Sequence, residues 1–426
     1  MKNFVRWWGW VGWLAAMGWA MAPGVQGADW PQWMGPQRDG STQEKVRTGW
    51  AAEGPRVAWS VVVGRGYSGP VISGGRLVLH HRKGDEDVVE CWDATRGGES
   101  SWRRVRPATY RDDFGFDDGP RATPAVVDGR VYVFGAEGTL ACVGLDQGEV
   151  LWSVSVVERF GAEKGFFGFA CSPLVVGGRV MLNVGGPRNS GVVAMDAGTG
   201  KIVWQATGHE AGYASPVLAG SGETASVVFF TREGLVQVGL GSGRVEIEHP
   251  WRSRQGASVN AATPLLVGNR VFLTASYGTG AVLLERPGPE ATGASGKGVR
   301  VVWSGDDRLS SHYASVVHRE GFVYGFHGRQ ESGALLRCVE LATGKVRWTA
   351  EPMGSGTLIL AGDRLLVLTE RGELCVVPAT ADGFRVEARA QVLGTGVRAA
   401  GALAGGRYYA RDGRRMVCLE LGEGTP

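Results

Sequence analysis

A thirteen-residue unit recurs along the chain. Residues 122–134, ATPAVVDGRVYVF, are matched in type by residues 171–183, CSPLVVGGRVMLN. Both have a small residue and Pro, an apolar run, a turn with Gly and a second apolar run. Further copies begin near residues 68, 214, 262, 313, 356 and 399, so there are eight copies at spacings of 43 to 54 residues. Such a period indicates a repeat architecture.

Each copy reads as four short strands. Apolar runs are separated by DG, GG, GN, GD or TG pairs, which are typical of hairpins between antiparallel strands. The last turn and fourth strand are clearest in GTGKIVW at 198–204 and ATGKVRW at 342–348. A four-stranded sheet of this kind buries both faces only between neighbours. The sequence therefore predicts an all-β fold, an eight-bladed β-propeller of four-stranded antiparallel blades.

The last copy lacks a fourth strand, because it ends at CLEL, residues 418–421. The missing strand stands at the other end of the chain, where RVAWSVVVG at 56–64 precedes the first copy. We expect this N-terminal strand to complete the C-terminal blade and close the ring, which removes exposed sheet edges. The fourth-strand Trp positions are then expected near residues 59, 102, 152, 204, 247, 303, 348 and 386, where 247 and 386 lack Trp.

The N-terminus predicts export. Residues 1–27 combine a basic start, an apolar run and a small-residue end, as signal peptides do, and the run is shorter than the roughly 20 residues of a spanning helix. An uncleaved anchor is the alternative. The expected organisation is a signal peptide at 1–27, an N-terminal rim segment at 28–53, the propeller at 54–421 and a C-terminal tail at 422–426. We expect a soluble periplasmic or extracellular monomer.

Charge and cysteines exclude other classes. Lys and Arg number 45 against 42 Asp and Glu, so no nucleic-acid or membrane partner is expected. The six Cys include Cys91, Cys142 and Cys338 at the same position in different blades. Those positions are about 10 Å or more apart, whereas a disulfide needs Cα atoms within about 7 Å. We expect buried free thiols.

Catalytic and metal motifs are weak. Neither GxSxG nor GxxxxGK[ST] occurs, and the adjacent His80 and His81 point to opposite faces of a strand. The stretch YRDDFGFDDGPRATP at 110–124 offers Asp117 and Asp118 as weak metal candidates. The favoured alternative is an inter-blade loop whose acids pair with its arginines. No catalytic residue and no metal are predicted.

A better candidate is the residue three places before the strand Pro. It is Tyr67, Arg121, Ala170, Tyr213, Ala261, Tyr313, Ser355 and Arg398 in the eight copies. Because the first strand of a blade lines the axis, this position lies near the mouth of the central channel. Tyr and Arg are enriched at binding hot spots. The candidate binding residues are Tyr67, Arg121, Tyr213, Tyr313 and Arg398; alternatively, they only fill the channel.

The unit resembles the PQQ-like β-propeller repeat family. DWPQWMGPQRDGSTQE near the mature start, GYSGPV at 66–71, DDGPRATPAVVDGRVYVFGAEGTLAC and FGFACSPLVVGGRV are similar to exported BamB-like proteins, which are related in fold to quinoprotein alcohol dehydrogenases. The resemblance implies a non-catalytic scaffold that binds a protein partner in the cell envelope, possibly in outer-membrane protein assembly, although this chain has no lipidation cysteine near its N-terminus.

The same resemblance implies an alternative, a PQQ-dependent oxidoreductase with Ca²⁺. Enzymes of that class use an Asp base and a disulfide between adjacent cysteines. This chain has no Cys-Cys pair, and no Asp matches the base. We therefore expect no cofactor and keep the quinoprotein dehydrogenase as the alternative. A hydrolase or a sugar-binding lectin is a third interpretation, which rests on the aromatic content alone.

Overall fold

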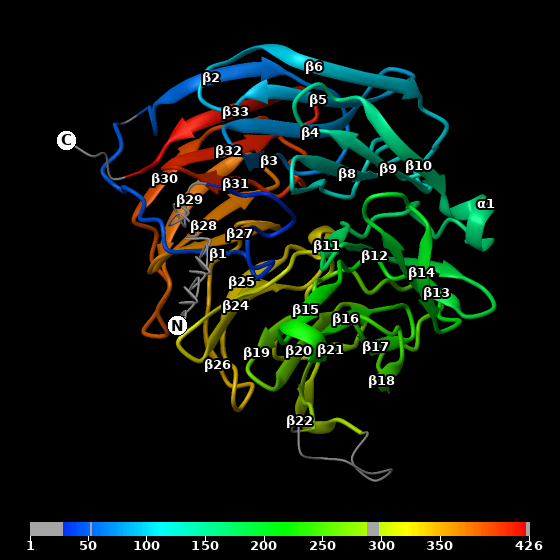
Figure 1. Ribbon diagram of the computed structural model, residues 1–426. Helices are drawn as coiled ribbons and strands as arrows, with labels where there is room; N and C mark the ends of the chain where they lie inside the picture. The colour runs from blue at the N-terminus through cyan, green and yellow to red at the C-terminus, as the bar shows by residue number, and fades with distance from the viewer. Residues whose placement is uncertain (1–28, 52, 288–297, 423–426) are drawn as a thin grey trace, which may run out of the picture.

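The computed structural model describes residues 29–51, 53–287 and 298–422. Eight four-stranded antiparallel sheets follow one another around a ring (Figure 1). The predicted eight-bladed β-propeller is confirmed. The expected signal peptide lies outside the described residues, as does the tail beyond residue 422. The short helices described are α1 at Val156–Phe160, η1 at Gly222–Thr224 and η2 at Gln330–Ser332.

The first four blades each run in chain order from the inner to the outer strand. Their strands are β3 Val71–Ser73, β4 Arg76–Lys83, β5 Glu86–Asp93 and β6 Gly97–Pro107; β7 Ala125–Val127, β8 Arg130–Phe134, β9 Thr139–Gly144 and β10 Val150–Ser155; β11 Leu174–Val176, β12 Arg179–Gly186, β13 Ser190–Asp196 and β14 Ile202–Ala206; and β15 Val217–Ala219, β16 Ser226–Phe230, β17 Gly234–Gly239 and β18 Val245–Pro250.

The last four blades follow the same plan. Their strands are β19 Leu265–Val267, β20 Arg270–Ala275, β21 Gly280–Glu285 and β22 Arg300–Gly305; β23 Val317–Arg319, β24 Phe322–His327, β25 Leu335–Glu340 and β26 Val346–Thr349; β27 Gly356–Ala361, β28 Arg364–Thr369, β29 Glu373–Pro378 and β30 Ala388–Gln391; and β31 Ala402–Ala404, β32 Arg407–Arg411, β33 Arg415–Glu420 and β2 Val57–Val62.

The eighth blade closes the ring as expected. Its outer strand β2 pairs antiparallel with β33, and Trp59 lies opposite Cys418. In Figure 1 the blue β2 lies beside the red β33, so the two ends of the propeller meet in one sheet. The expected buried free thiols are also confirmed, because all six cysteines are buried and unpaired.

Outer-strand tryptophans fasten six of the eight blades to the next blade. The Trp102 indole donates to the carbonyl of Leu145 at 2.7 Å, and its ring lies on Gly148, where an added Cβ would be 2.4 Å from the indole. Gly148 also has φ +68°. The turn therefore requires glycine both for its backbone conformation and for the close approach of the indole. Indoles that bond to the next blade are those of Trp59, Trp102, Trp152, Trp204, Trp303 and Trp348.

Two outer strands lack this tryptophan. Ile247 takes its position in β18, opposite Gln237, as expected. In β30 the position belongs to Ala388, which lies opposite Val376 and packs towards the eighth blade. The position thus lies two residues after the expected residue 386, because the loop before β30 is longer than the TGK turn of the other blades.

Hydroxyl groups join the starts of the inner strands. The amide of Gly69 donates to Oγ1 of Thr123, whose own amide donates to Oγ of Ser172, at 3.0 and 2.9 Å. The amide of Ser172 continues the series to Ser215 at 2.9 Å. These bonds explain why a small hydroxyl residue stands directly before Pro in the repeats, since it links neighbouring blades around the axis.

The N-terminal segment enters the central channel, which corrects the expectation that it wraps the rim. Trp30 pairs with Ile72 in the first blade, and β1, Ser41–Thr42, adds a parallel fifth strand to the inner edge of β27. Only the continuation follows the predicted course, where Val46 bridges to Gly422 and Gly54 lies against Ala390 of an outer strand. The repeat pattern contains no information on a segment that occurs once.

Arg38 holds this segment in place from inside the channel. Its guanidinium donates to the carbonyls of Ser172, Pro173 and Pro216 and to Oε1 of Gln32, at 2.9 to 3.1 Å. The side chain is buried, and burial lowers its pKa. Three backbone carbonyls of the third and fourth blades thus converge on one cation, in place of a carboxylate.

Blade 1 contains two buried histidines in separate hydrogen-bonded pairs. His80 contacts Asp87 at 2.9 Å, and His81 contacts Glu90 at 3.1 Å. Nδ1 of His81 accepts from the amide of Gly64 at 2.8 Å, so its Nε2 carries the proton and donates to Glu90. The adjacent histidines therefore do not share a ligand, as their positions on a strand predicted.

This arrangement predicts acid sensitivity of the fold. Burial lowers the pKa of His81 to about 4 from its ordinary 6.5, so the unfolded chain takes up this proton first as the pH falls. Its stabilising contribution is complete above pH 6.5 and is lost towards pH 4, by at most about 1.4 kcal/mol per pH unit. Urea unfolding between pH 7.5 and 4 gives the free energy of unfolding at each pH. This free energy should fall less steeply with decreasing pH in His81→Gln than in the wild type. Equal slopes would contradict this assignment.

Candidate binding site at the channel mouth

A cavity of about 570 Å³ opens at the mouth of the channel. The residues that line it include the five candidates, Tyr67, Arg121, Tyr213, Tyr313 and Arg398. Of the other ring positions, Ala170 and Ala261 line it and Ser355 does not. Trp33 of the N-terminal segment also lines the cavity and donates through Nε1 to Thr263 at 2.8 Å. The structure thus brings the candidates together, while their role in binding stays a prediction.

Two arginines flank the ring of Tyr67. The guanidinium carbons of Arg121 and Arg398 each lie 5.5 Å from its centroid, within cation–π range. Arg398 also lies 5.7 Å from the rings of Phe116 and Tyr313. These contacts fix the orientation of the aromatic faces around the mouth.

Carboxylates compensate both arginines. Glu370 accepts from Nε of Arg398 at 2.9 Å and from the hydroxyl of Tyr313 at 2.5 Å, and Asp112 pairs with Arg121 at 3.3 Å. Burial raises the pKa of Tyr213 to about 12 and also raises that of Tyr313. The tyrosines are therefore neutral at pH 7, and the mouth presents aromatic surface without an uncompensated charge.

Four phenylalanines form an aromatic rim above the tyrosines. Phe114 and Phe116 are 54% and 51% exposed, and the ring of Phe167 lies 5.3 and 6.0 Å from theirs. Phe166 lies 6.2 Å from Phe114. The amide of Phe167 donates to the Tyr213 hydroxyl at 3.0 Å. Sequence reasoning missed these residues, although Phe-Gly-Phe at 114–116 and Phe-Phe at 166–167 stand out in loops.

The aspartate-rich loop at residues 110–124 fixes the position of this rim. Oδ1 of Asp118 accepts from the amide of Asp112, and Oδ1 of Asp117 accepts from the amide of Gly119, at 2.8 and 2.6 Å. Oδ2 of Asp112 accepts from the amide of Phe116 at 2.6 Å. The two weak metal candidates thus cap turns in the loop that presents the phenylalanines. Within the described ranges, no three His, Cys, Asp or Glu residues are grouped to hold a metal ion.

The family model described as outer membrane protein assembly factor BamB matches residues 85–349. The chain belongs to this family. A BamB from Yersinia pestis is 26% identical over 153 residues, which are 35% of this chain and 36% of that protein. The match therefore spans about a third of the curated relative. Among the part of the chain described, no helix has the length and apolarity needed to cross a membrane.

Solved structures share the fold of this BamB-family chain. BamB from Moraxella catarrhalis is 17% identical with a TM-score of 0.58, over 85% of this chain and 97% of that one. The quinohemoprotein alcohol dehydrogenase from Comamonas testosteroni is 15% identical with a TM-score of 0.65, over 94% of this chain and 81% of that one. At these identities the likeness concerns the fold alone.

Proposed function

We propose that this BamB-family protein is a non-catalytic scaffold that binds a segment of a protein partner at its channel mouth. The observation that carries the proposal is the aromatic cavity at the channel mouth, which Trp33 of the N-terminal segment also lines. By analogy with the relative named as an assembly factor, we propose that the protein is exported and that its partner belongs to outer-membrane protein assembly.

Exposed aromatic rings on fixed loops favour peptide binding. Aromatic residues provide large contact areas and lose little side-chain entropy when a partner binds. Phe114 and Phe116 are half exposed although they belong to a loop fixed by Asp112 and Asp118. A protein that keeps such rings in water gains no stability from them, so their position supports a binding role.

The lining residues do not fit the alternative, a quinone with Ca²⁺. Ca²⁺ takes six to eight oxygen ligands, but Glu370 and Asp112 are engaged by Arg398 and Arg121. Glu331, which lines the cavity, pairs with Arg329 at 3.2 Å. Addition of pyrroloquinoline quinone and Ca²⁺ is therefore expected to leave the melting temperature unchanged, and a saturable rise would contradict the non-catalytic assignment.

A displayed library of random peptides tests the proposal. The immobilised wild-type chain should enrich peptides with Phe, Tyr, Trp or Leu. For an enriched peptide made synthetically, Phe114→Ser with Phe116→Ser should weaken binding at least about tenfold, since truncation of a hot-spot residue costs about 2 kcal/mol or more. Fluorescence anisotropy with the labelled peptide measures this, and the melting temperature should not change.

The matched control is Val57→Ser with Val62→Ser on the outer strand β2, where the side chains are 53% and 77% exposed. This variant removes exposed apolar surface at the edge of the eighth blade and should bind the peptide as the wild type does. If it loses binding while the phenylalanine variant retains it, the partner adds a strand to a blade edge and the mouth is not the site. Equal binding by all three proteins would also overturn the proposal.

A further inference from the structure

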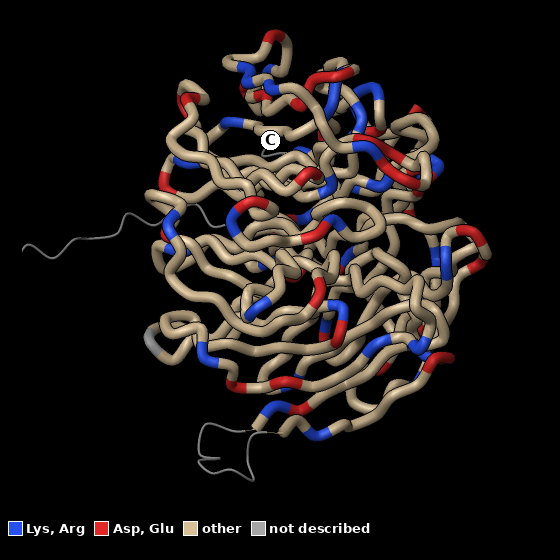
Figure 2. The backbone as a smooth tube through the Cα atoms, turned by 90° about the vertical axis from the view of Figure 1, so that its right-hand side faces the viewer, with Lys and Arg blue, Asp and Glu red and all other residues tan. Residues whose placement is uncertain are grey.

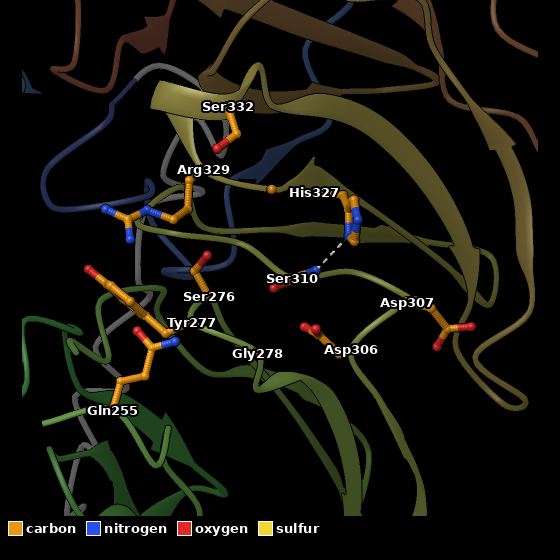
Figure 3. A pocket seen from close by; sticks show the side chains of 11 residues that line it. Gln255, Ser276, Tyr277, Gly278, Asp306, Asp307, Ser310, His327, Arg329 and Ser332 are labelled. Atoms are coloured by element: carbon orange, nitrogen blue, oxygen red, sulfur yellow. Dashed lines mark hydrogen bonds between the residues drawn. The ribbon is translucent and has the colours of Figure 1, made fainter. Parts of the chain in front are cut away.

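A second cavity of about 570 Å³ adjoins the channel mouth. It lies between the fifth and sixth blades, and three of its lining residues, Gln255, Tyr277 and Arg329, also line the mouth. Figure 3 shows these three on one side of the cavity, with Asp306 and Asp307 on the other. We call this cavity the side cleft. A ligand site in a protein is usually about 300 to 1,000 Å³, so the two cavities together suit a ligand longer than a small molecule.

Tyr277 forms the shared wall in a strained conformation. It has φ +65° and precedes Gly278 with φ +70° in the turn between β20 and β21. A bulky residue is uncommon with such a backbone, and Gly or Asn would cost less there. Its hydroxyl contacts Nε2 of His312 at 2.7 Å, and Arg329 lies 4.7 Å from its ring centroid. The turn therefore keeps an aromatic ring between the cavities at the expense of backbone strain.

The side cleft differs from the mouth in charge. Asp306 is exposed and has no hydrogen bond or ion pair with any residue in the described ranges. Asp307 forms an ion pair with Arg308 at 3.1 Å, and the Arg337 guanidinium donates to its backbone carbonyl at 2.5 Å. His327 accepts from the amide of Ser310 at 3.0 Å (Figure 3), which leaves its Nε2 protonated. An uncompensated carboxylate beside hydroxyl groups favours a cationic partner, whereas the mouth has no free charge.

We propose that the mouth and the side cleft form one groove for an extended polypeptide. The segment places an aromatic or apolar side chain in the mouth and a Lys or Arg in the side cleft beside Asp306, with Tyr277 between them. This inference rests on the proposed function and specifies the class of segment bound. A neutral oligosaccharide could also stack on the aromatic rings and donate hydroxyl groups to the carboxylate, but it has no positive charge to compensate it.

The peptide library also tests this inference. Peptides enriched on the wild type should carry Lys or Arg at a fixed distance from the aromatic residue. In a synthetic peptide, replacing that Lys by Gln should weaken binding about threefold to fivefold, as expected for one exposed ion pair. Asp306→Asn should remove the preference for Lys over Gln but leave the preference for the aromatic residue. Anisotropy at low and high salt measures both effects.

Asp128→Asn is the matched control, because Asp128 is an exposed aspartate with φ +49° in the turn that follows β7, in another blade. It should bind both peptides as the wild type does. A preference for Lys that survives Asp306→Asn, or no preference at all, overturns the inference and leaves the scaffold proposal standing. Failure to enrich any peptide overturns both. Displacement of the bound peptide by maltohexaose or chitohexaose at equal concentration would assign the groove to sugars and also overturn it.

Discussion

Replacing Arg38 with Ala is expected to lower the free energy of unfolding by about 3 to 5 kcal/mol, the lower part of the sum for three buried carbonyls that lose their donor. The change leaves the carbonyls of Ser172, Pro173 and Pro216 without their donor in the channel. An unsatisfied buried carbonyl costs about 1 to 3 kcal/mol, so a smaller total would mean that water enters. Urea unfolding of the wild type and variant measures the difference.

Arg47→Ala is the control for that experiment. Arg47 lies in the same segment, and its side chain is exposed. Its backbone amide donates to the carbonyl of Leu421, and the substitution keeps this bond. Its replacement should change the free energy of unfolding by less than about 0.5 kcal/mol, as for other surface sites. If both variants lose the same stability, the segment rather than the Arg38 guanidinium is responsible, and the role assigned to the carbonyls is wrong.

Gly148→Ala is expected to destabilise the propeller by about 3 kcal/mol, through a left-handed backbone and overpacking together. The added Cβ would lie 2.4 Å from the indole of Trp102, so the second blade must shift against the first. Gly178→Ala separates the two contributions. Gly178 has φ +70° but no atom within 4 Å of an added Cβ, so its replacement should cost only about 1 to 2 kcal/mol.

Thermal and urea unfolding of the two glycine variants measure this comparison. The difference between their losses in free energy of unfolding measures the cost of the clash between the added methyl group and the Trp102 indole. Trp102→Ala combined with Gly148→Ala should recover part of the loss that the glycine substitution adds, because the two residues touch. Equal destabilisation at the two glycines would show that the indole yields without cost and that the tryptophans do not fix the spacing of the blades.

The sequence predicted the propeller because each blade corresponds to one copy of the repeat. Strand alternation, Gly turns and the Trp positions occur eight times, so a shift of two residues in one copy, at Ala388, does not affect the predicted fold. The ring position before the strand Pro also led to Tyr67, Tyr213 and Tyr313, which line one cavity. The repeats were therefore sufficient to predict the blades and the residues at the start of the inner strands.

Features that occur once were beyond that reasoning. Nothing in the letters around Arg38 shows that three carbonyls from other blades converge on it. Phe114 and Phe167 are 53 residues apart, and only the loops of two blades bring their rings within 5.3 Å. Tyr277 belongs to an ordinary hairpin in sequence, and its positive φ becomes apparent only from the backbone. These are long-range or conformational properties, which periodicity does not encode.

The use of β2 as the last strand of the last blade orders the folding of the chain. Residues 57–62 have no native strand partner until β33, Arg415–Glu420, is available, so their pairing closes a loop of almost the whole propeller, with a corresponding cost in chain entropy. The segment with Arg38 directly precedes β2 and must be inside the channel in the finished ring. Chains truncated before β33 should thus keep an unpaired strand edge that can bind a chaperone or another chain.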